Sequence, residues 1–370
     1  MKLSPVELRH TLHRNPEISF LEFRTSELLV NTIKDSIDNT HLKIHRPFKT
    51  GLLVDYKINE GDYLLFRADI DALPINEENE IDFKSENNYM HACGHDVHTS
   101  ILYSFLNYVT ENNIDQNILF LFQPAEESGG GAMEFYKTGV FESFKIRNAF
   151  ALHVTDEYKE GTIASTPGVL FASALEVDFE FKGLSAHVAF PKEGNNAFNA
   201  LRIFLDECDK LPKVEDSPVV FGIGKIYSGE VRNITPGFAK LETSIRSLSE
   251  EKVLNFCTTL ETILETVKSK TGVDYKMKKG AHYPEVIVDK ILFKKLSAKL
   301  SKKYEFIDCG HKMTGEDFGF FSKKFPSFMF WLGTSKSGER FGLHNPRFLP
   351  PDSVIEKGKN IFTTILELFI

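Results

Sequence analysis

Hydrophobic and polar residues follow two different periods along the first half of this chain, and the period predicts the element. Apolar residues recur every three or four positions in residues 21–33 and, most clearly, in residues 97–109, which places them on one face of a helix. A short helix is expected at residues 132–136. Short apolar runs predict strands at residues 51–56, 63–66, 117–122 and 149–154. Because strands and helices alternate, we predict an α/β fold whose mixed or mainly parallel sheet carries helices on both faces.

The order of elements changes after residue 168. The pattern then predicts a strand, a helix, two strands, a helix and a strand, at residues 175–181, 197–211, 219–226, 239–246, 250–268 and 273–277. This βαββαβ order is typical of a ferredoxin-like α+β unit. The α/β pattern returns with a helix at 288–300, a strand at 328–332 and a helix at 353–369. We therefore predict one α/β domain from residues 1–168 and 281–370, interrupted by an inserted domain of residues 169–280.

Composition narrows the class of protein. The 370 residues include 44 basic and 52 acidic side chains, hence a net charge of −8, and 42% are hydrophobic, as in an ordinary globular protein. No apolar run approaches the roughly 20 residues that cross a bilayer, and the first 15 residues lack the apolar stretch of a signal peptide. The four cysteines are widely spaced, which is not typical of a disulfide scaffold. We expect a cytoplasmic protein that binds small molecules and neither membranes nor nucleic acids.

Three histidines, a cysteine and an aspartate fall within residues 91–98, at the start of the clearest predicted helix. Thiolate, imidazole and carboxylate are the donors that zinc and manganese take from proteins. Gly94 lies between Cys93 and His95 and lets the backbone bend, so that both side chains can turn toward one point. Alternatively, Cys93 is a small buried residue and the histidines pack against or cap the helix. This cluster alone leaves both interpretations open.

Further candidate donors follow predicted strands. Glu126 and Glu127 come directly after the strand at residues 117–122, at the carboxyl end where open α/β sheets bind ligands. His153 lies near the end of another strand, and His344 lies in a turn-rich loop before the last helix. Each has a structural alternative as a solvated carboxylate or a packed histidine. The combined set is too large for a closed four-ligand site and fits one or two ions with a position for water: Cys93, His95, Glu127, His153 and His344.

Several motifs occur in order along nearly the whole chain. They are HRNPE (13–17), RADIDALP (67–74), MHACGHD (90–96), FQPAEE (122–127), LHV (152–154), GEDF (315–318) and GLHNP (342–346). Together they resemble the aminoacylase and hippurate hydrolase branch of the co-catalytic metallopeptidases, which includes N-acetyldiaminopimelate deacetylases and the plant auxin-conjugate amidohydrolases. The resemblance implies a metal-dependent amidohydrolase of N-acyl, above all N-acetyl, amino acids.

The resemblance also implies roles for single residues. The five donors named above would bind one or two divalent ions, which could be zinc, manganese, cobalt or nickel. Glu126 would act as general base, and Asp69 would orient a ligand histidine. In the wider family a metal-binding histidine often stands at the position of Arg67. The resemblance therefore implies that metal binding in this branch depends on Cys93.

The inserted domain matches a family motif at residues 183–191, GLSAHVAFP. The resemblance implies that this domain acts as a lid and as the interface of a homodimer, and that His187 binds the oxyanion or the substrate carboxylate. The branch commonly has histidine where this chain has Lys192, which leaves the acyl amino acid undefined. Asn233 and Arg246 are candidates for binding a substrate carboxylate, with a turn residue and a surface charge as the alternatives.

Other functions remain open at this point. A dipeptidase or carboxypeptidase of the same family would use the same site. A cysteine hydrolase would use Cys93 as nucleophile with His95 or His153 as base. A non-catalytic metal-binding scaffold would keep the fold and the ligands without the reaction.

Overall fold

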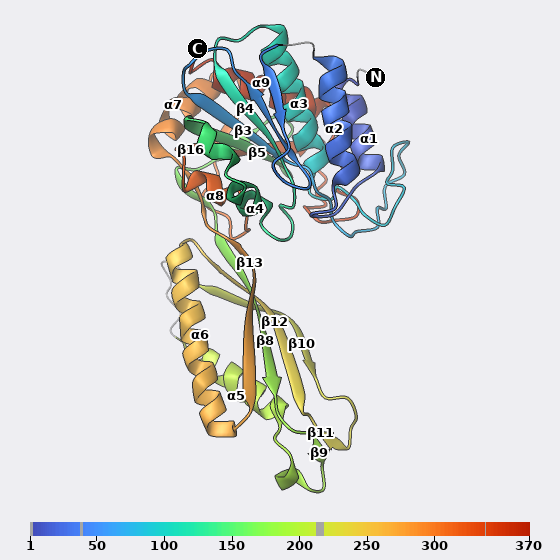
Figure 1. Cartoon of the computed structure of the whole chain (residues 1–370), viewed down its shortest axis with the longest axis vertical. Coiled ribbons are helices and arrows are strands. Elements are labelled where there is room, and N and C mark those ends of the chain that lie inside the picture. The colour runs from blue at the N-terminus through green and yellow to red at the C-terminus, as the bar shows by residue number, and fades with distance from the viewer. Residues whose placement is uncertain (1–2, 38–39, 212–217, 337) are drawn as a thin grey trace. The chain divides into compact units, whose positions relative to one another are not determined.

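The computed structural model describes residues 3–37, 40–211, 218–336 and 338–370. The chain forms two compact units, coloured along the sequence in Figure 1: unit 1 comprises Met1–Leu170, Val286–His311 and Asp317–Ile370, and unit 2 comprises Phe171–Glu285 and Lys312–Glu316. The predicted interruption at residues 169–280 is therefore shifted by a few residues at each end. The return of residues 312–316 to unit 2 had no counterpart in the sequence analysis.

Unit 1 is built on a mixed sheet. In the described residues its strand order is β1 (Leu42–His45), β2 (Leu52–Tyr56), β4 (Asn117–Gln123), β3 (Tyr63–Asp69), β5 (Ile146–Lys159), β16 (Ser327–Ser335), β6 (Ile163–Ser165) and β15 (Phe306–Asp308). Strands β4, β3, β5 and β16 run parallel, whereas β2 and β6 are antiparallel to β4 and β16. Strands β3, β4 and β16 are buried along almost their whole length and β5 is buried along its middle, as expected of a sheet covered on both faces. The predicted mixed α/β fold is confirmed.

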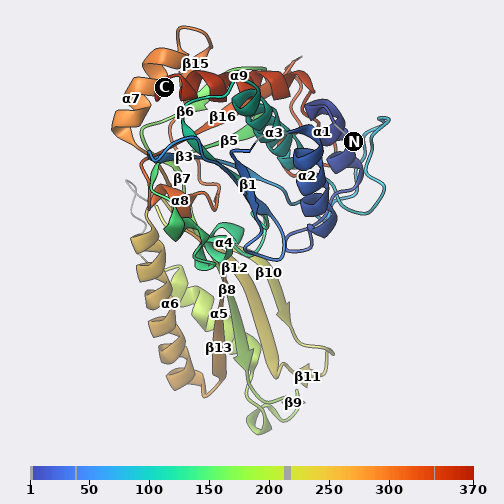
Figure 2. The same ribbon diagram turned by 45° about the horizontal axis from the view of Figure 1, so that its top comes forward.

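Helices cover both faces of this sheet (Figures 1 and 2). The chain steps from β3 through α3 (His95–Glu111) to β4, and then steps back past β3 through α4 (Gly131–Lys137) to β5. Because such crossovers are right-handed, the two helices lie on opposite faces. Helices α1 (Pro5–Arg14) and α9 (Ser353–Leu366) pack on α3, α7 (Lys290–Leu300) packs on α9, and α8 (Gly319–Ser322) packs on α4. No helix among the described residues is long and apolar enough to span a bilayer.

The predicted helical stripe forms the centre of the core. Val97, Ile101, Phe105 and Val109 of α3 are all fully buried. The predicted helix at 21–33 is α2 (Phe23–Ser36), and the one expected from residue 288 begins at Lys290, because Asp289 caps it by accepting the N–H of Leu292 at 2.7 Å.

The sequence analysis missed α1, although its start signal is local. Ser4 accepts the N–H of Glu7 at 3.2 Å, and the Glu7 carboxylate accepts the N–H of Ser4 at 2.8 Å. With Pro5 in the first turn, this is a capping box that stabilises the helix start. The buried face of α1 includes Arg9 and His13, so the sequence shows no continuous apolar stripe there.

Unit 2 has the element order predicted for the inserted domain. Its sheet runs β10 (Val220–Ser228), β12 (Phe238–Ser247), β8 (Ser173–Lys182) and β13 (Asp274–Tyr283), with every pair antiparallel. Helices α5 (Ala197–Cys208) and α6 (Glu250–Thr271) contact each other and one face of the sheet. Their apolar faces and the inward residues of β8 and β12 form one buried core. This is the strand arrangement of a split βαβ unit.

Short strands complete both units. Strand β7 (Gly168–Phe171) pairs with β14 (Val286–Val288), close to where the chain passes between the two units. In unit 2, the two-residue strands β9 (Ala186–His187) and β11 (Ile234–Thr235) pair antiparallel within loops beyond the main sheet.

A buried ion network joins α1 to the start of α3. The ring of His13 lies with Nδ1 2.9 Å from Asp96 Oδ2 and Nε2 3.1 Å from Glu77 Oε1. The Arg9 side chain donates to the same Asp96 oxygen at 3.3 Å. Burial lowers the pKa of His13, but the charges and hydrogen bonds of Asp96 and Glu77 outweigh it and raise that pKa to about 9. The ring is therefore charged at neutral pH.

This network predicts a loss of stability in mild alkali. The pKa of His13 is about 9 in the folded protein against 6.5 as its ordinary value, so the stabilisation is complete below pH 6.5 and is lost as pH rises through about 9. The difference corresponds to roughly 3 kcal/mol of unfolding free energy. Denaturant unfolding at pH 6.5 and pH 9.5 measures it. The His13→Gln variant should lose this pH dependence, and an unchanged slope in the variant would contradict the assignment.

Candidate active site

The five predicted metal donors converge in unit 1, beyond the carboxyl ends of β3 and β4. The donor atoms of Cys93, His95 and His153 all lie within 4.8 Å of one another, and so do those of Cys93, Glu127 and His344. Donors that bind one ion at about 2.0–2.3 Å stand roughly 3–4.5 Å apart, so each group is compact enough for a single ion. Cys93 belongs to both groups, which places them side by side.

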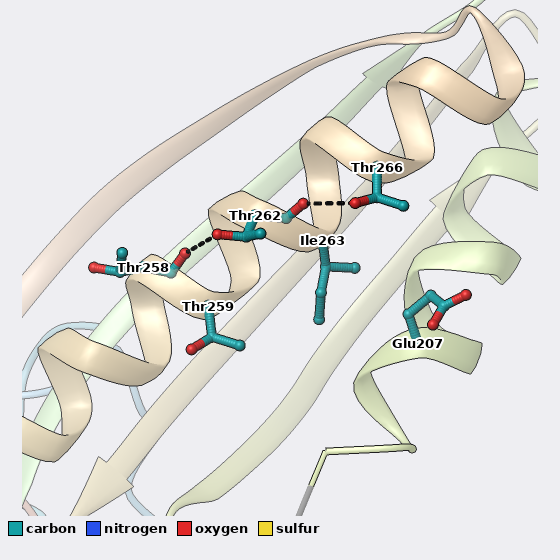
Figure 3. A pocket seen from close by; sticks show the side chains of 6 residues that line it. All are labelled: Glu207, Thr258, Thr259, Thr262, Ile263 and Thr266. Atoms are coloured by element: carbon teal, nitrogen blue, oxygen red, sulfur yellow. Dashed lines mark hydrogen bonds between the residues drawn. The ribbon is translucent and has the colours of Figure 1, made fainter.

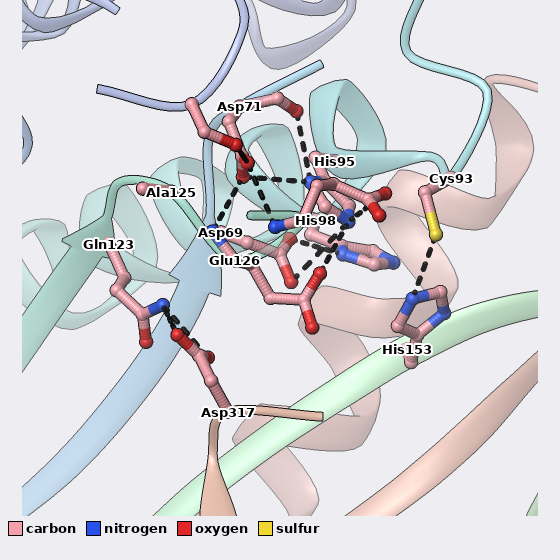
Figure 4. Close-up of polar contacts among 12 residues, drawn as sticks. Asp69, Asp71, Cys93, His95, His98, Gln123, Ala125, Glu126, His153 and Asp317 are labelled. Atoms are coloured by element: carbon pink, nitrogen blue, oxygen red, sulfur yellow. Dashed lines mark hydrogen bonds and ion pairs between the residues drawn. The ribbon is translucent and has the colours of Figure 1, made fainter. Parts of the chain in front are cut away.

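Gly94 allows α3 to begin directly against β5. Its φ is +83°, and a Cβ at this position would lie 2.4 Å from Cγ2 of Val154. The close approach brings Cys93, just before the helix, to His153 on β5: Sγ and Nε2 are 3.4 Å apart (Figure 4). A residue other than glycine would push the two halves of the cluster apart.

The two adjacent carboxylates lie in the turn that follows β4. The N–H groups of Glu126 and Glu127 donate to the carboxylate of Asp71 at 3.1 and 3.0 Å. Oε1 of Glu127 lies 3.7 Å from Nε2 of His95, and Oε2 of Glu126 lies 4.0 Å from the same nitrogen. Both side chains are nearly buried. The surface-charge alternative therefore does not hold for either glutamate.

His344 reaches the cluster from the loop between β16 and α9. Its N–H donates to the carbonyl of Ala92 at 2.9 Å, and its Nε2 lies 3.5 Å from Oε2 of Glu127. Asp156 of β5 anchors the loop, because its Oδ2 accepts the N–H groups of Phe341 and Gly342 at 2.6 and 2.9 Å. No role was predicted for Asp156, whose only signal in the sequence is its position three residues after His153.

The cluster fits a divalent cation. Nε2 of His95 and Oε1 of Glu127 are buried and have no hydrogen-bond partner, a costly state that a cation would relieve. The mixed sulfur, nitrogen and oxygen donors suit zinc and neighbouring transition metals. Burial and the nearby Glu127 and Glu126 raise the pKa of the Cys93 thiol well above its usual range. Burial lowers the pKa of His95, but Asp69, Asp71 and Glu127 raise it to about 10. Metal binding at neutral pH must therefore displace protons.

A backbone carbonyl fixes the ring of His95. Nδ1 of His95 donates to the carbonyl of Asp71 at 2.9 Å, which leaves Nε2 facing the cluster. Asp69, predicted to orient a ligand histidine, lies with Oδ1 2.6 Å from Nδ1 of His98 and with Oδ2 3.7 Å from Nε2 of His95. Nε2 of His98 accepts the N–H of Val154 at 2.9 Å, so both of its nitrogens are engaged. Asp69 fixes His98 against β5, and Asp71 fixes His95.

Arg67 occupies the position where the wider family often has a metal-binding histidine. Its guanidinium donates to Asp69 Oδ2 and to Asp317 Oδ1, both at 2.7 Å, and all three side chains are fully buried. Burial opposes ionisation of Asp69, but the charges of His95, His98 and Arg67 outweigh it and hold its pKa well below the usual range. No role was predicted for Asp71, His98 or Asp317. Asp71 and Asp317 lie within the motifs RADIDALP and GEDF, and His98 lies two residues after MHACGHD.

Of the residues predicted to bind substrate, His187 and Asn233 lie close together in unit 2, and Arg246 lies apart from them. His187 of β9 is opposite Ile234 of β11, and the N–H of Val188 donates to the carbonyl of Asn233 at 3.1 Å. These loops lie at the end of the sheet where β8 ends at Lys182 and β12 begins at Phe238, whereas Arg246 lies eight residues further along β12, roughly 26 Å from Phe238. Arg246 donates to the carbonyl of Met313 at 3.0 Å.

A groove on unit 2 does not form a second polar site. It has a volume of about 360 Å³ and is lined by Ile263 and Glu207 together with four threonines of α6 (Figure 3). The hydroxyls of Thr262 and Thr266 donate to the carbonyls of Thr258 and Thr262, four residues earlier. Their donors are satisfied within the helix, so they do not point to a ligand.

Comparisons with known proteins agree with this geometry. The family model described as peptidase family M20/M25/M40 matches residues 65–368. The chain is 36% identical over 355 residues to the N-acetyldiaminopimelate deacetylase of Exiguobacterium sibiricum, covering 95% of each chain. It is 35% identical over 365 residues to the enzyme of the same name from a Geobacillus species, covering 96% of each.

A solved structure gives the same result. The YXEP protein of Bacillus subtilis, described as a dinuclear metal binding peptidase of the M20 family, superposes with a TM-score of 0.80 at 25% identity, covering 98% of this chain and 97% of its own. These matches confirm the predicted resemblance and the prediction of a metal-dependent hydrolase of amide bonds. The chain belongs to the peptidase family M20/M25/M40.

Proposed function

We propose that this protein removes the acyl group from N-acyl amino acids and that N-acetyldiaminopimelate is its substrate. The convergence of five metal donors with the Glu126 carboxylate beside them carries the proposal. The substrate class is supported by the relatives in Exiguobacterium and Geobacillus, whose names state that activity.

The donor groups support two ions. His95 and His153 would hold one, Glu127 and His344 the other, and Cys93 lies within reach of both groups. A divalent ion in such a site would polarise the substrate carbonyl and lower the pKa of a bound water toward about 7. Zinc, manganese, cobalt and nickel all suit this donor set.

Glu126 is the acid and base of the proposed reaction. Its carboxylate lies at the edge of the donor groups and accepts a proton from the attacking water as the water oxygen bonds to the acyl carbon. The same proton then passes to the amide nitrogen as the carbon–nitrogen bond breaks. The products are a carboxylic acid and an amine; at neutral pH the proton of the acid passes to the amine, which leaves a carboxylate and an ammonium group, so atoms and charges balance.

The substrate is held by unit 2 in this proposal. His187 would donate to the developing oxyanion, and the neighbouring Asn233 would donate to the substrate carboxylate. Arg246 is the alternative partner for the carboxylate through the guanidinium donors that do not contact Met313. A lid role for unit 2 is part of the same proposal.

Unit 2 also offers an interface for a homodimer. In the described residues β10 pairs with β12 on one side only, and it exposes Ile223, Ile226 and Tyr227. An open strand edge with exposed apolar side chains favours pairing with another strand. We propose that two copies associate through this edge, and sedimentation of the purified protein measures the mass.

A substrate panel tests the proposed function. The protein is loaded with zinc, manganese or cobalt and assayed with N-acetyldiaminopimelate, N-acetylalanine, hippurate and an alanine dipeptide. We expect the highest kcat/KM for N-acetyldiaminopimelate, with activity lost to a chelator and restored by metal. Faster dipeptide cleavage would establish a dipeptidase instead. Chelator-insensitive turnover that alkylation blocks would establish a cysteine hydrolase, and metal binding without any turnover would establish a scaffold.

A further inference from the structure

Glu22 is a buried carboxylate for which the proposed mechanism has no role. The residue is fully buried at the start of α2, yet its side chain does not cap that helix. Oε1 accepts two backbone N–H groups, from Phe20 at 3.0 Å and from Ala125 at 2.8 Å. Ala125 directly precedes Glu126 and Glu127. The carboxylate therefore links the N-terminal segment to the turn that carries the general base and a metal ligand.

Both N–H donors belong to residues in a strained conformation. Phe20 and Ala125 have φ values of +64° and +54°, a region that costs a non-glycine residue about 1 kcal/mol or more. Such conformations persist only where surrounding contacts hold them. A single acceptor oxygen that binds both N–H groups supplies this contact.

The same N-terminal segment holds the turn at a second point. The Ser19 hydroxyl donates to Oδ2 of Asp71 at 2.6 Å, and Asp71 accepts the N–H groups of Glu126 and Glu127. The ring of Phe20 packs where a Cβ on Gly129 would lie, 2.3 Å from Cε2, so the far side of the turn is also closed. The backbone of residues 125–129 is thus fixed by residues 19–22.

We infer that Glu22 is a positioning residue, which sets the direction of the Glu126 and Glu127 side chains by holding the backbone of Ala125. The inference rests on the proposed function for the roles of those two glutamates. A misplacement of about 1 Å at a reacting group can lower the rate 100-fold. Loss of a group that orients a metal ligand typically weakens metal binding 10–100-fold.

The test compares three variants. Glu22→Ala removes the acceptor, and Glu22→Gln keeps an oxygen in its place. Glu17→Ala is the matched control, because the Glu17 carboxylate also accepts two backbone N–H groups, from Arg24 and Thr25 at 3.2 and 2.8 Å, but these belong to α2. Five quantities are measured: the Kd for Zn²⁺ by chelator competition, kcat and KM for N-acetyldiaminopimelate, amide exchange of residues 122–131 in the metal-free protein, and the melting temperature.

We expect Glu22→Ala to raise the Kd for Zn²⁺ by roughly 10–100-fold, to lower kcat by about as much while KM changes little, and to speed exchange of the turn. Glu22→Gln should restore most of each quantity, and Glu17→Ala should lower only the melting temperature. Unchanged exchange and Zn²⁺ affinity in Glu22→Ala, or equal effects in Glu17→Ala, would overturn the inference. A wild type that binds Zn²⁺ but does not cleave the substrate refutes the proposed function alone, since exchange and affinity still report on Glu22.

Discussion

Replacing Glu126 with glutamine is expected to abolish most turnover and leave metal binding intact. Glutamine has the same shape but cannot take a proton from water, and general acid–base catalysis contributes about 10²–10⁴-fold to such reactions. We therefore expect kcat to fall by about 10²–10⁴-fold. Glu126 lies close enough to His95 and Glu127 to form a further donor group with them, but it is not one of the five proposed ligands, Cys93, His95, Glu127, His153 and His344. Steady-state kinetics and metal content of the same preparation measure the two effects.

Glu127→Gln is the matched comparison, because it makes the same chemical change one residue further along the same turn. Glu127 belongs to the second donor group, so this variant should lose metal affinity as well as turnover. If the two variants behave alike in metal content, or if Glu126→Gln keeps the wild-type rate, the division of roles between these carboxylates is wrong.

Replacing His95 with alanine is expected to lose the metal. His95 contributes to the first donor group, and its Nε2 is one of the buried atoms without a hydrogen-bond partner. Loss of a residue that merely orients a ligand costs 10–100-fold in affinity, so loss of the ligand itself should cost at least about 100-fold. Turnover should fall in parallel and recover in part at high metal concentration. Competition with a chelator gives the affinity.

His91→Ala controls for the loss of a buried ring in the same segment. His91 is nearly as buried as His95, but no donor group contains it. The His91→Ala variant should be less stable than the wild type and should bind metal with an affinity similar to that of the wild type. A common drop in affinity for both variants would mean that packing of residues 91–98, and not ligation by His95, controls metal binding.

The sequence predicted the elements best where the pattern is local and repeated. The stripe of α3 needed only apolar residues every four positions, and the βαββαβ order of unit 2 followed from alternating short patterns. Helix α1 was missed because its buried residues include Arg9 and His13, which read as polar. Their partners, Asp96 and Glu77, lie far along the chain.

The same distinction applies to the site. Cys93 and His95 were visible because they lie together around a glycine. Nδ1 of His95, however, donates to the carbonyl of Asp71, and a contact to a backbone carbonyl cannot be recognised in a sequence. The hydrogen bond from Ala125 to Glu22 depends on the positive φ values of Phe20 and Ala125, and neither residue type predicts such a conformation.

From its sequence alone, this protein was identifiable as a two-part α/β chain with a metal-binding set of side chains and a candidate base. Hydrophobic period and residue chemistry are properties of neighbouring positions, so they can be read directly. Only the tertiary structure decided that Cys93 meets His153, sixty residues away, and that His187 lies beside Asn233 and far from Arg246. Those relations depend on strand register and on the close contact at Gly94, which arise only when distant segments pack.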